Sequence, residues 1–223
     1  MEKKIDNMFK AGAHFAFSKS RRHPTAAPFI FGVKNKVEIF DLEKTQIVLE
    51  KALAFISALG KDKKPILIVG GKSEARKAVV EAATALNMPF VDKRWIGGTL
   101  TNFPEIRRRV EKLEKLTVER EKGELVKYTK KERLLIDREI SNLEYMFSGI
   151  VSLKGMPAAL IVVDPKKEAI AVKEAQDKGI PVIAISGSDC NLKEVTYPIV
   201  GNDASQASIA FFMSEIVKAY KAA

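Results

Sequence analysis

Short apolar runs with the length of buried β-strands alternate with amphipathic helical segments along most of this chain. The runs span residues 66–69, 90–91, 159–163, 181–185 and 197–200. Short strands of this kind joined by helices are typical of a parallel sheet that is covered by helices on both faces. The alternation therefore predicts a doubly wound α/β fold.

The turn after the first of these strands, residues 70–73, reads Gly-Gly-Lys-Ser and resembles part of a phosphate-binding loop. A P-loop would need a glycine where this chain has Ile66, inside the strand. A dinucleotide-binding fingerprint that starts at Gly70 also lacks its second and third glycines. We therefore interpret the segment as a tight turn in which Ser73 caps the next helix.

One segment between residues 105 and 147 departs from the alternation, because it is highly charged and has a different apolar period. Two sets of residues recur there at spacings of four, three and four, namely Ile106, Val110, Leu113 and Thr117, then Ile136, Ile140, Leu143 and Phe147. This spacing predicts two helices with coiled-coil seams. The pattern Thr129-x-x-Glu132 is a capping box that begins the second helix.

The simplest organisation that contains both patterns is an α/β domain with an inserted antiparallel helical hairpin. We expect the α/β domain to comprise residues 41–104 and 148–223, and the hairpin to comprise residues 105–147. Residues 1–40 show no clear long period, and we expect them to form a basic segment that packs on the body.

Net charge gives the first indication of function. The 223 residues include 38 Lys and Arg against 28 Asp and Glu, a formal net charge of +10. Such an excess favours a polyanionic partner, with nucleic acid ahead of an anionic membrane. Six basic residues and no acidic one lie between Phe9 and Lys36, whereas the hairpin is nearly balanced. We therefore expect the N-terminal segment to face the polyanion.

Other classes of site have little support in the composition. The single cysteine, Cys190, excludes an intrachain disulfide, and two histidines do not provide a cluster of zinc ligands. No carboxylate pair or activated nucleophile accompanies the turns, so we expect no catalytic residue, no metal and no cofactor. No run of 18 apolar residues and no secretory type of N-terminus occurs, so we expect a cytoplasmic protein.

The turn VDKRWIGGTLTNF, before the hairpin, has an unusual composition. Lys93, Arg94 and Trp95 precede two glycines, and Asn102 follows just before the predicted helix. Arginine makes bidentate contacts with phosphate, an indole offers a stacking plane, and glycine lets the backbone approach another surface closely. Two interpretations remain open for Trp95, which are packing under the hairpin and contact with RNA.

An ordered set of motifs gives the chain a specific resemblance. These are AGAHF with RRHP, FIFGVKNKVEIFDLEKT, KRWIGGTLTNF, PAALIVVDP, EAQDKGIPVIAI and YPIVGNDASQASI. Together they cover nearly the full length, and the chain resembles the bacterial small-subunit ribosomal protein family S-two. The resemblance implies a flavodoxin-like sheet with a protruding helical hairpin and a place near the junction of the head and body of the subunit. It also implies a role without catalysis, in late subunit assembly and in docking of ribosomal protein S-one.

The chain departs from the family pattern at several positions. Ala16 and Phe17 stand where glycine and histidine are usual, and His23 precedes Pro24. Residues 186–188 read Ser-Gly-Ser in place of the usual Asp-Thr-Asn, which moves the loop carboxylate to Asp189. Family roles that belong to those side chains are therefore not transferred to this chain.

We expect the protein to clamp the backbone of small-subunit ribosomal RNA, because phosphate contacts position a protein on A-form RNA whose major groove hides the base edges. Neither DNA nor a membrane is expected as a partner. Three parts of the chain should face one RNA surface, namely the basic N-terminal segment, the turn at residues 93–95 and the root of the hairpin at residues 107–109. The residues predicted to bind RNA are Lys19, Arg21, Arg22, Lys34, Lys36, Lys93, Arg94, Trp95, Asn102, Arg107 and Arg108.

Two alternatives belong to other functional classes. A small-molecule or nucleotide-binding enzyme would gather Gly70, Gly71, Asp164 and residues 186–188 beyond the carboxyl ends of the strands. The missing phosphate fingerprint and catalytic set disfavour it. A protein-docking module that uses the hairpin as its contact is compatible with RNA binding and needs only a partner.

Overall fold

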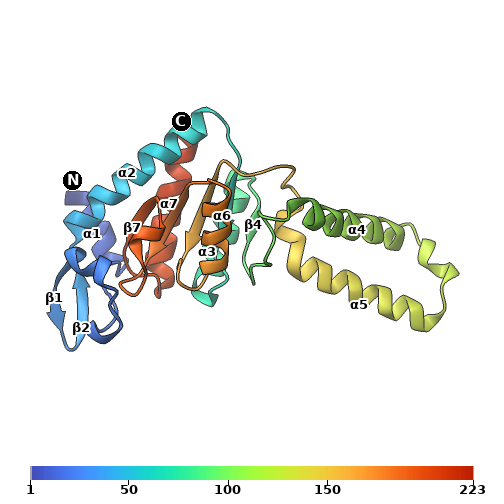
Figure 1. Ribbon diagram of the computed structural model, residues 1–223, viewed down its shortest axis with the longest axis horizontal. Coiled ribbons are helices and arrows are strands. Elements are labelled where there is room, and N and C mark those ends of the chain that lie inside the picture. The colour runs from blue at the N-terminus through green and yellow to red at the C-terminus, as the bar shows by residue number, and fades with distance from the viewer. Residues whose placement is uncertain (1, 223) are drawn as a thin grey trace.

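The computed structural model describes residues 2–222 and is built around a five-stranded parallel sheet (Figure 1). Its strands are β3 (Ile66–Val69), β4 (Phe90–Val91), β5 (Ala159–Val163), β6 (Val182–Ser186) and β7 (Tyr197–Val200). They lie in the order β4-β3-β5-β6-β7, and every neighbouring pair is parallel. This is the flavodoxin-like order, in which the chain reverses direction across the sheet between its first and third strands. The predicted doubly wound fold is confirmed.

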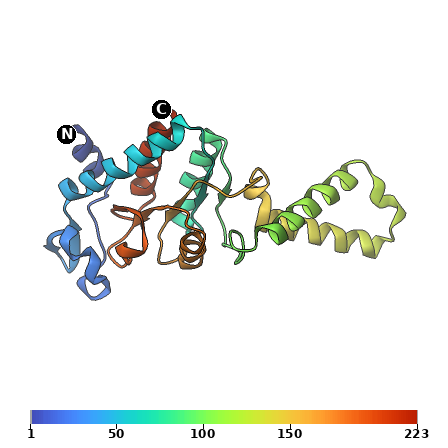
Figure 2. The same ribbon diagram turned by 45° about the horizontal axis from the view of Figure 1, so that its top comes forward.

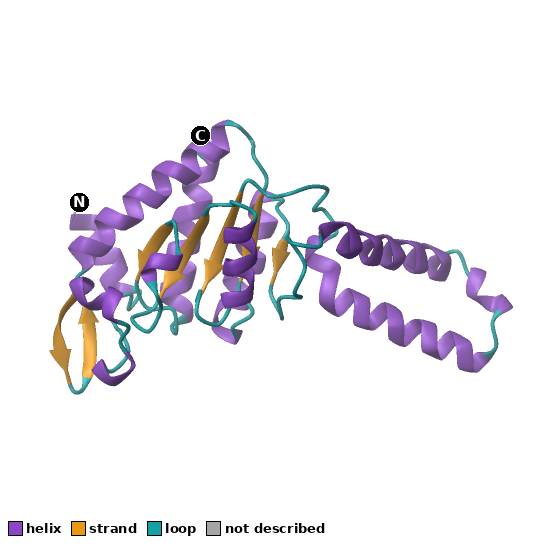
Figure 3. Ribbon diagram, in the orientation of Figure 1, coloured by secondary structure: helices purple, strands orange, loops and turns teal. Residues whose placement is uncertain are grey.

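Helices cover both faces of this sheet (Figure 3). They are α1 (Glu2–Lys10), α2 (Leu42–Lys61), α3 (Ser73–Leu86), α4 (Phe103–Glu121), α5 (Lys130–Phe147), α6 (Ala169–Asp177) and α7 (Gln206–Lys221). Successive side chains of a strand point to opposite faces. Ile66 and Ile68 therefore join the core under α2, α3 and α7, whereas Leu67 and Val69 join the core under α6 and the base of α4 and α5.

The inserted hairpin consists of α4 and α5, which project away from the sheet side by side (Figures 1 and 2). The predicted seam is largely buried, with Ile106, Val110, Leu113, Ile140, Leu143 and Phe147 in the core. The capping box at the start of α5 is present, because the Glu132 amide donates to Thr129 Oγ1 and the Thr129 amide donates to the Glu132 carboxylate. The predicted helical hairpin is confirmed.

The N-terminal segment contains more regular structure than its sequence pattern indicates. Besides α1, it forms an antiparallel pair of strands, β1 (Ile30–Lys34) and β2 (Val37–Phe40). Asn35 and Lys36 turn between them with φ values of 51° and 65°. A lysine at positive φ is not a common hairpin signal, since such turns favour Asn-Gly and Asp-Gly. Met8, from α1, is fully buried in the main core.

The N-cap predicted at Ser73 is wrong by one residue, and two other cap patterns in the sequence, Asp164-Pro165 and Asp203-x-x-Gln206, do not begin their helices either. Ser73 is the first residue of α3, which Lys72 precedes as the N-cap. Asp164 has a φ of 64° and lies in a turn, so α6 begins only at Ala169. Asp203 does not form a capping box for α7, whose N-cap is Ser205. Asp164 and Asp203 both accept hydrogen bonds from the Lys72 ammonium, which explains why Asp203 is not used as a cap.

None of the helices within residues 2–222 combines the length and hydropathy that crossing a membrane would require.

Candidate nucleic-acid interface

One buried carboxylate, that of Glu174 on α6, holds the segment that follows β4. Its oxygens accept hydrogen bonds from Trp95 Nε1 at 3.1 Å and from the amides of Gly98, Leu100 and Thr101 at 2.7, 2.9 and 3.1 Å. Burial alone would raise the pKa of Glu174, but these bonds to its charged form outweigh burial, and the pKa is lowered. The segment that carries the predicted contacts is therefore fixed to the core.

Trp95 itself is only 5% exposed and packs in the core beside Val91 and Leu100. Trp95 is therefore packed inside the protein, which favours the first of its two interpretations. Glu174 was missed by sequence reasoning, although a signal for it exists. It lies on the buried face of α6 with Ala171 and Ala175, where a carboxylate needs partners.

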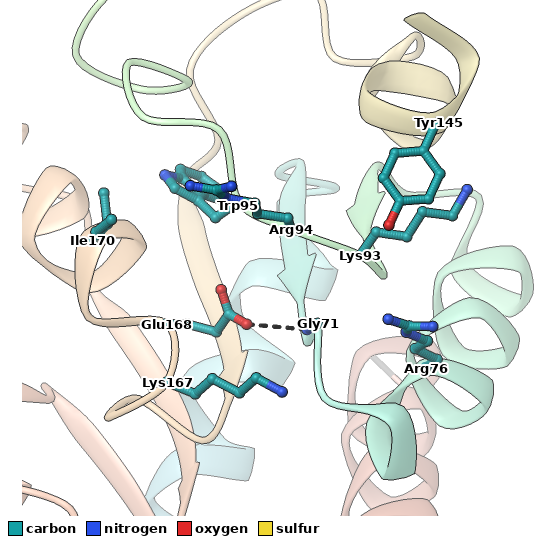
Figure 4. A pocket seen from close by; sticks show the side chains of 9 residues that line it. All are labelled: Gly71, Arg76, Lys93, Arg94, Trp95, Tyr145, Lys167, Glu168 and Ile170. Carbon is teal, nitrogen blue, oxygen red and sulfur yellow. Dashed lines mark hydrogen bonds between the residues drawn. The ribbon is translucent and has the colours of Figure 1, made fainter. Parts of the chain in front are cut away.

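Lys93 and Arg94 leave this fixed segment and line a cavity of about 240 Å³ at its base (Figure 4). Arg94 is exposed, and Lys93 lies with its ammonium 4.4 Å from the ring centroid of Tyr145 on α5. Arg76 and Lys167 line the same cavity. Among residues 2–222, none of these four cations lies within 4.0 Å of a carboxylate oxygen, so their positive charge exceeds that of Glu168, the one carboxylate that lines the cavity.

The arginines at the start of α4 have different environments. Arg107 donates to the Val151 carbonyl at 3.2 Å and pairs with Glu111 and Glu114, so it ties the two ends of the hairpin together. Arg108 is exposed and pairs with Glu105 at 3.3 Å. Arg108 lies at the surface and makes only this pair within its own helix, so a partner can reach it, whereas Arg107 is held by several contacts within the protein.

Asn102 is the exposed residue before α4, and its side chain makes no capping hydrogen bond. Its backbone carbonyl instead accepts the amides of Glu105 and Ile106. The amide side chain is thus available at the root of the hairpin, where Asn102 lines a surface pocket together with Arg109.

The basic residues near the N-terminus also divide into engaged and available groups. Arg22 donates to Glu38 Oε1 at 2.9 Å, and Glu38 is fully buried. Arg21 is half exposed, pairs with Asp189 at 3.2 Å and lies 4.1 Å from the ring centroid of Phe17. Lys19 is exposed and makes no ion pair with any described residue. Arg22 is therefore a structural cation, while Lys19 is available to a ligand.

Lys34 and Lys36 lie at the tip of the β1–β2 hairpin, and both are exposed. No carboxylate within residues 2–222 pairs with either of them. Phe31 on β1 is 80% exposed and Val33 is 59% exposed. The tip of this hairpin therefore presents two free ammonium groups with apolar side chains beside them.

The structure does not bring all the predicted RNA contacts into one cluster. The N-terminal group packs at the carboxyl end of β6, where the amides of Phe17 and His23 donate to Ser188. Lys93 and Arg94 follow β4, at the far side of the sheet order. Both groups thus lie along the carboxyl edge of the sheet, but β3 and β5 separate them (Figure 1).

A buried cluster of charges lies between the two groups. The Lys72 ammonium is 3.1 Å from Asp164 Oδ2 and 3.4 Å from Asp203 Oδ2. Burial and the neighbouring Asp164 raise the pKa of Asp203. Asp164, Cys190 and Asp203 place ligand atoms within 4.8 Å of one another, a spacing suited to an ion, but the ammonium of Lys72 already contacts both carboxylates. The protein's own cation thus offsets one of the two carboxylate charges and occupies the position that an ion would take.

The two residues that most often serve in catalysis do not form a reactive site here. Burial raises the pKa of the Cys190 thiol well above its usual range, which disfavours the nucleophilic thiolate. His14 stacks on Phe9 with ring centroids 4.3 Å apart, and burial lowers its pKa. Its buried Nδ1 has no hydrogen-bond partner within the described residues.

Comparison with known proteins decides among the alternatives. The family model described as Ribosomal protein S2 matches residues 8–223 of the chain. The chain belongs to the ribosomal protein S2 family. It is 39% identical over 215 residues to the small ribosomal subunit protein uS2 of Sulfurimonas denitrificans, a match that covers 96% of this chain and 83% of that protein.

Membership in the ribosomal protein S2 family makes the chain a structural ribosomal protein and not an enzyme. The residues that would form the ligand site of an enzyme are consistent with this assignment, because several of their polar groups already make hydrogen bonds within the protein. The Gly71 amide donates to Glu168, and Asp164 is bound to Lys72. Ser188 accepts the Phe17 amide. These particular groups are therefore bonded within the protein, where an enzyme of this kind would need them free.

Proposed function

We propose that this ribosomal protein binds small-subunit ribosomal RNA with the carboxyl edge of its sheet and clamps the RNA backbone at two places. One place is formed by Lys19, Arg21 and the tip with Lys34 and Lys36. The other is the root of the α4–α5 hairpin, formed by Lys93, Arg94, Asn102 and Arg108. We propose that Arg22, Trp95 and Arg107 position these contacts from inside the protein.

The observation that supports this proposal most strongly is the uneven pairing of cations. Every Lys and Arg of α4 lies within 4.0 Å of a carboxylate oxygen. By contrast, Lys19, Lys34, Lys36, Lys93 and Arg94 have no such partner among residues 2–222. Unpaired cations can neutralise phosphates and release counterions, which is the main source of affinity for nucleic acids. The carboxyl edge is thus better suited to RNA than the face of the hairpin that α4 forms.

Family membership supports the finer assignment. We propose that the contacted RNA lies near the junction of the head and body of the cytoplasmic small subunit. The two separated groups would then join RNA elements late in assembly. We also propose that the protein helps to dock ribosomal protein S-one, for which the projecting hairpin offers a surface.

The proposal is tested by titrating the full chain with an RNA fragment from the head–body junction at several salt concentrations. Lys34→Ala/Lys36→Ala and Lys93→Ala/Arg94→Ala should each flatten the slope of log K against log salt by roughly one to two units, about one for each lost phosphate contact. Lys112→Ala/Lys115→Ala removes two cations that are paired on the hairpin and should leave the slope nearly unchanged. Equal slopes in all variants, or no preference over an unrelated RNA, would refute the clamp.

A further inference from the structure

The cavity beside Lys93 lies at the topological switch point of the sheet. In open α/β sheets, ligands bind beyond the carboxyl ends of the strands where the strand order reverses. Here that point lies between β3 and β5, whose following turns contribute Gly71 and Glu168 to the cavity. The cavity of about 240 Å³ is slightly below the range of roughly 300–1,000 Å³ typical of sites for drug-sized ligands. Its size suits one small ligand better than an extended cofactor.

The charge of the cavity selects the class of ligand. Arg76, Lys93, Arg94 and Lys167 come from three separate segments and line it together with a single carboxylate, Glu168 (Figure 4). Four cations and one anion leave a formal charge of +3 if Glu168 is ionised. Unlike the surface pairs on α4, these cations have no carboxylate within 4.0 Å in the described chain. An anion with several acceptor oxygens would satisfy them.

The position of Glu168 shows where in the cavity that anion would lie. Its Oε1 accepts the Gly71 amide at 3.1 Å, so an internal carboxylate occupies the strand-to-helix turn that holds phosphate in many nucleotide-binding sheets. The backbones meet closely here, since a Cβ at Gly71 would lie 1.9 Å from the Lys93 carbonyl oxygen. A ligand phosphate is therefore excluded from the Gly71 amide and must lie further out, among the cationic side chains.

The cavity has a second wall, away from the cations that would hold the phosphate, and this wall is suited to a flat ring. Arg94 lies beside Trp95 and Ile170 on one side of the cavity, while Arg76, Lys93 and Tyr145 lie on the other (Figure 4). A guanidinium plane stacks well on nucleobases, and the buried Trp95 gives that side a rigid base. The phosphate-binding and ring-binding groups are thus on two walls of one small cavity.

We infer that this cavity binds one phosphate-bearing nucleotide, with the phosphate near Arg76 and Lys93 and the base near Arg94 and Ile170. The inference deepens the proposed function and rests on it where the nucleotide belongs to RNA, as an unpaired residue of the bound strand. A free mononucleotide has the same chemistry and is the other source of such a ligand. The experiment separates the two sources.

Trp95 is the only tryptophan of the chain, so its fluorescence reports on the cavity directly. The full chain is titrated with AMP, adenosine, inorganic phosphate and a single-stranded RNA of six nucleotides, and equilibrium dialysis checks each affinity. AMP or the RNA should give a saturable signal and bind about tenfold or more tightly than adenosine, because only they bring a phosphate. Tighter binding of RNA identifies a nucleotide of RNA as the ligand, and tighter binding of AMP identifies a free nucleotide.

Matched variants separate the cavity from the surrounding charge. Arg76→Ala/Lys167→Ala removes two cations that line the cavity and should weaken AMP and RNA binding about tenfold. Lys77→Ala/Lys173→Ala removes two exposed cations of α3 and α6 that do not line it, and should change binding less than about twofold. Equal effects of the two pairs, or equal binding of AMP and adenosine, would overturn the inference.

Glu168→Gln provides a test in the opposite direction. It keeps an acceptor for the Gly71 amide but removes the negative charge beside the phosphate, so AMP should bind severalfold more tightly. If AMP binding is weaker or unchanged in a Glu168→Gln variant with the circular dichroism of wild type, AMP does not bind in this cavity. In Arg76→Ala/Lys167→Ala the junction-RNA salt slope should fall by no more than about one unit, the share of the single cavity phosphate, so loss of cavity binding is distinguished from loss of the whole RNA clamp.

Discussion

Two groups of charges lie along the carboxyl edge of the same sheet, and they are built in opposite ways. Lys72 is enclosed with Asp164 and Asp203, and the side chains of these three residues are no more than 15% exposed. The cations around Arg76 and Lys93 border an open cavity and have no carboxylate partner in the described chain. An unbalanced charge is too costly to bury, but it is tolerated where solvent or a ligand can reach it. Local charge balance therefore separates the structural cluster from the candidate binding site.

Removing the cation of the closed cluster should have the largest effect on stability. Lys72→Met leaves Asp164 and Asp203 facing each other without a counter-ion, and we expect a loss of about 3–5 kcal/mol in the free energy of unfolding near pH 8. Urea unfolding followed by circular dichroism measures it. Lys77→Met, an exposed position on α3, is the control and should cost less than about 0.5 kcal/mol.

The cost of Lys72→Met should also depend on pH, because Asp203 has a pKa raised by burial and by Asp164. An acid whose pKa is higher in the folded state destabilises the fold once it ionises. The penalty is therefore absent below the usual carboxyl pKa of about 4, grows as the pH rises, and is complete above the raised folded pKa. Without Lys72 that folded pKa rises further, so the variant should lose stability between mildly acidic and alkaline pH. A cost independent of pH would contradict this account of the cluster.

A second large loss of stability is expected at Glu174, whose carboxylate holds the segment that carries Lys93 and Arg94. Glu174→Gln replaces one of two charged acceptors by an amide group that donates, and it leaves buried backbone amides of Gly98, Leu100 or Thr101 unsatisfied. We expect a loss of about 2–3 kcal/mol in the free energy of unfolding at neutral pH, together with a shift in the fluorescence of Trp95. Glu139→Gln, at a half-exposed α5 carboxylate that pairs with Lys112, is the control and should change the free energy of unfolding by less than about 1 kcal/mol and leave the fluorescence of Trp95 unchanged.

The pH dependence of the Glu174 variant has the opposite sign from that of the Lys72 variant. Because hydrogen bonds lower the pKa of Glu174 in the folded state, its ionised form stabilises the fold above the unfolded pKa of about 4.3. This stabilisation is lost as the pH falls through the lower folded pKa. The difference between wild type and Glu174→Gln should thus shrink in acid, and a constant difference would speak against the ionised carboxylate as its cause.

The fold could be predicted from sequence where the pattern is local. Strands buried on both faces, such as Ile66–Val69 and Ala159–Val163, read as continuous apolar runs, and the heptad spacing of α4 and α5 is visible within each helix. The β1–β2 hairpin gave no such signal. Phe31 and Val33 are exposed, so β1 lacks the buried alternate positions that identify a strand.

The site could be predicted only in part, because charge is visible in a sequence and pairing is not. Arg21 and Arg22 look alike as neighbours, yet Arg22 pairs with a buried Glu38 16 positions away and Arg21 stays half exposed. The partners of Lys72 lie 92 and 131 positions along the chain. Folding brings such pairs together, and no spacing rule that covers one helix or one turn can show them.

A smaller loss of stability is expected at Gly71, whose backbone lies against that of Lys93 at the base of the cavity. In Gly71→Ala the new Cβ would lie 1.9 Å from the Lys93 carbonyl oxygen, so the segment after β4 must move, at a cost of about 1–3 kcal/mol. Because Lys93 moves with it, AMP binding should weaken as well. Gly97→Ala lies in the same segment but has open space around its Cβ position, and both its stability and its AMP binding should stay close to wild type.

The smallest effect on stability is expected from the cations of the open cavity themselves. Arg76 and Lys167 have no ion pair within residues 2–222, so Arg76→Ala/Lys167→Ala removes mutual repulsion and little attraction. Its free energy of unfolding should stay within about 0.5 kcal/mol of wild type, and a slight gain should appear at low salt, where charges are screened least. Thermal unfolding at low and high salt measures both. A loss above about 1 kcal/mol would mean that these cations hold the fold together as Lys72 does, and charge balance would then no longer separate a binding site from a structural cluster in this protein.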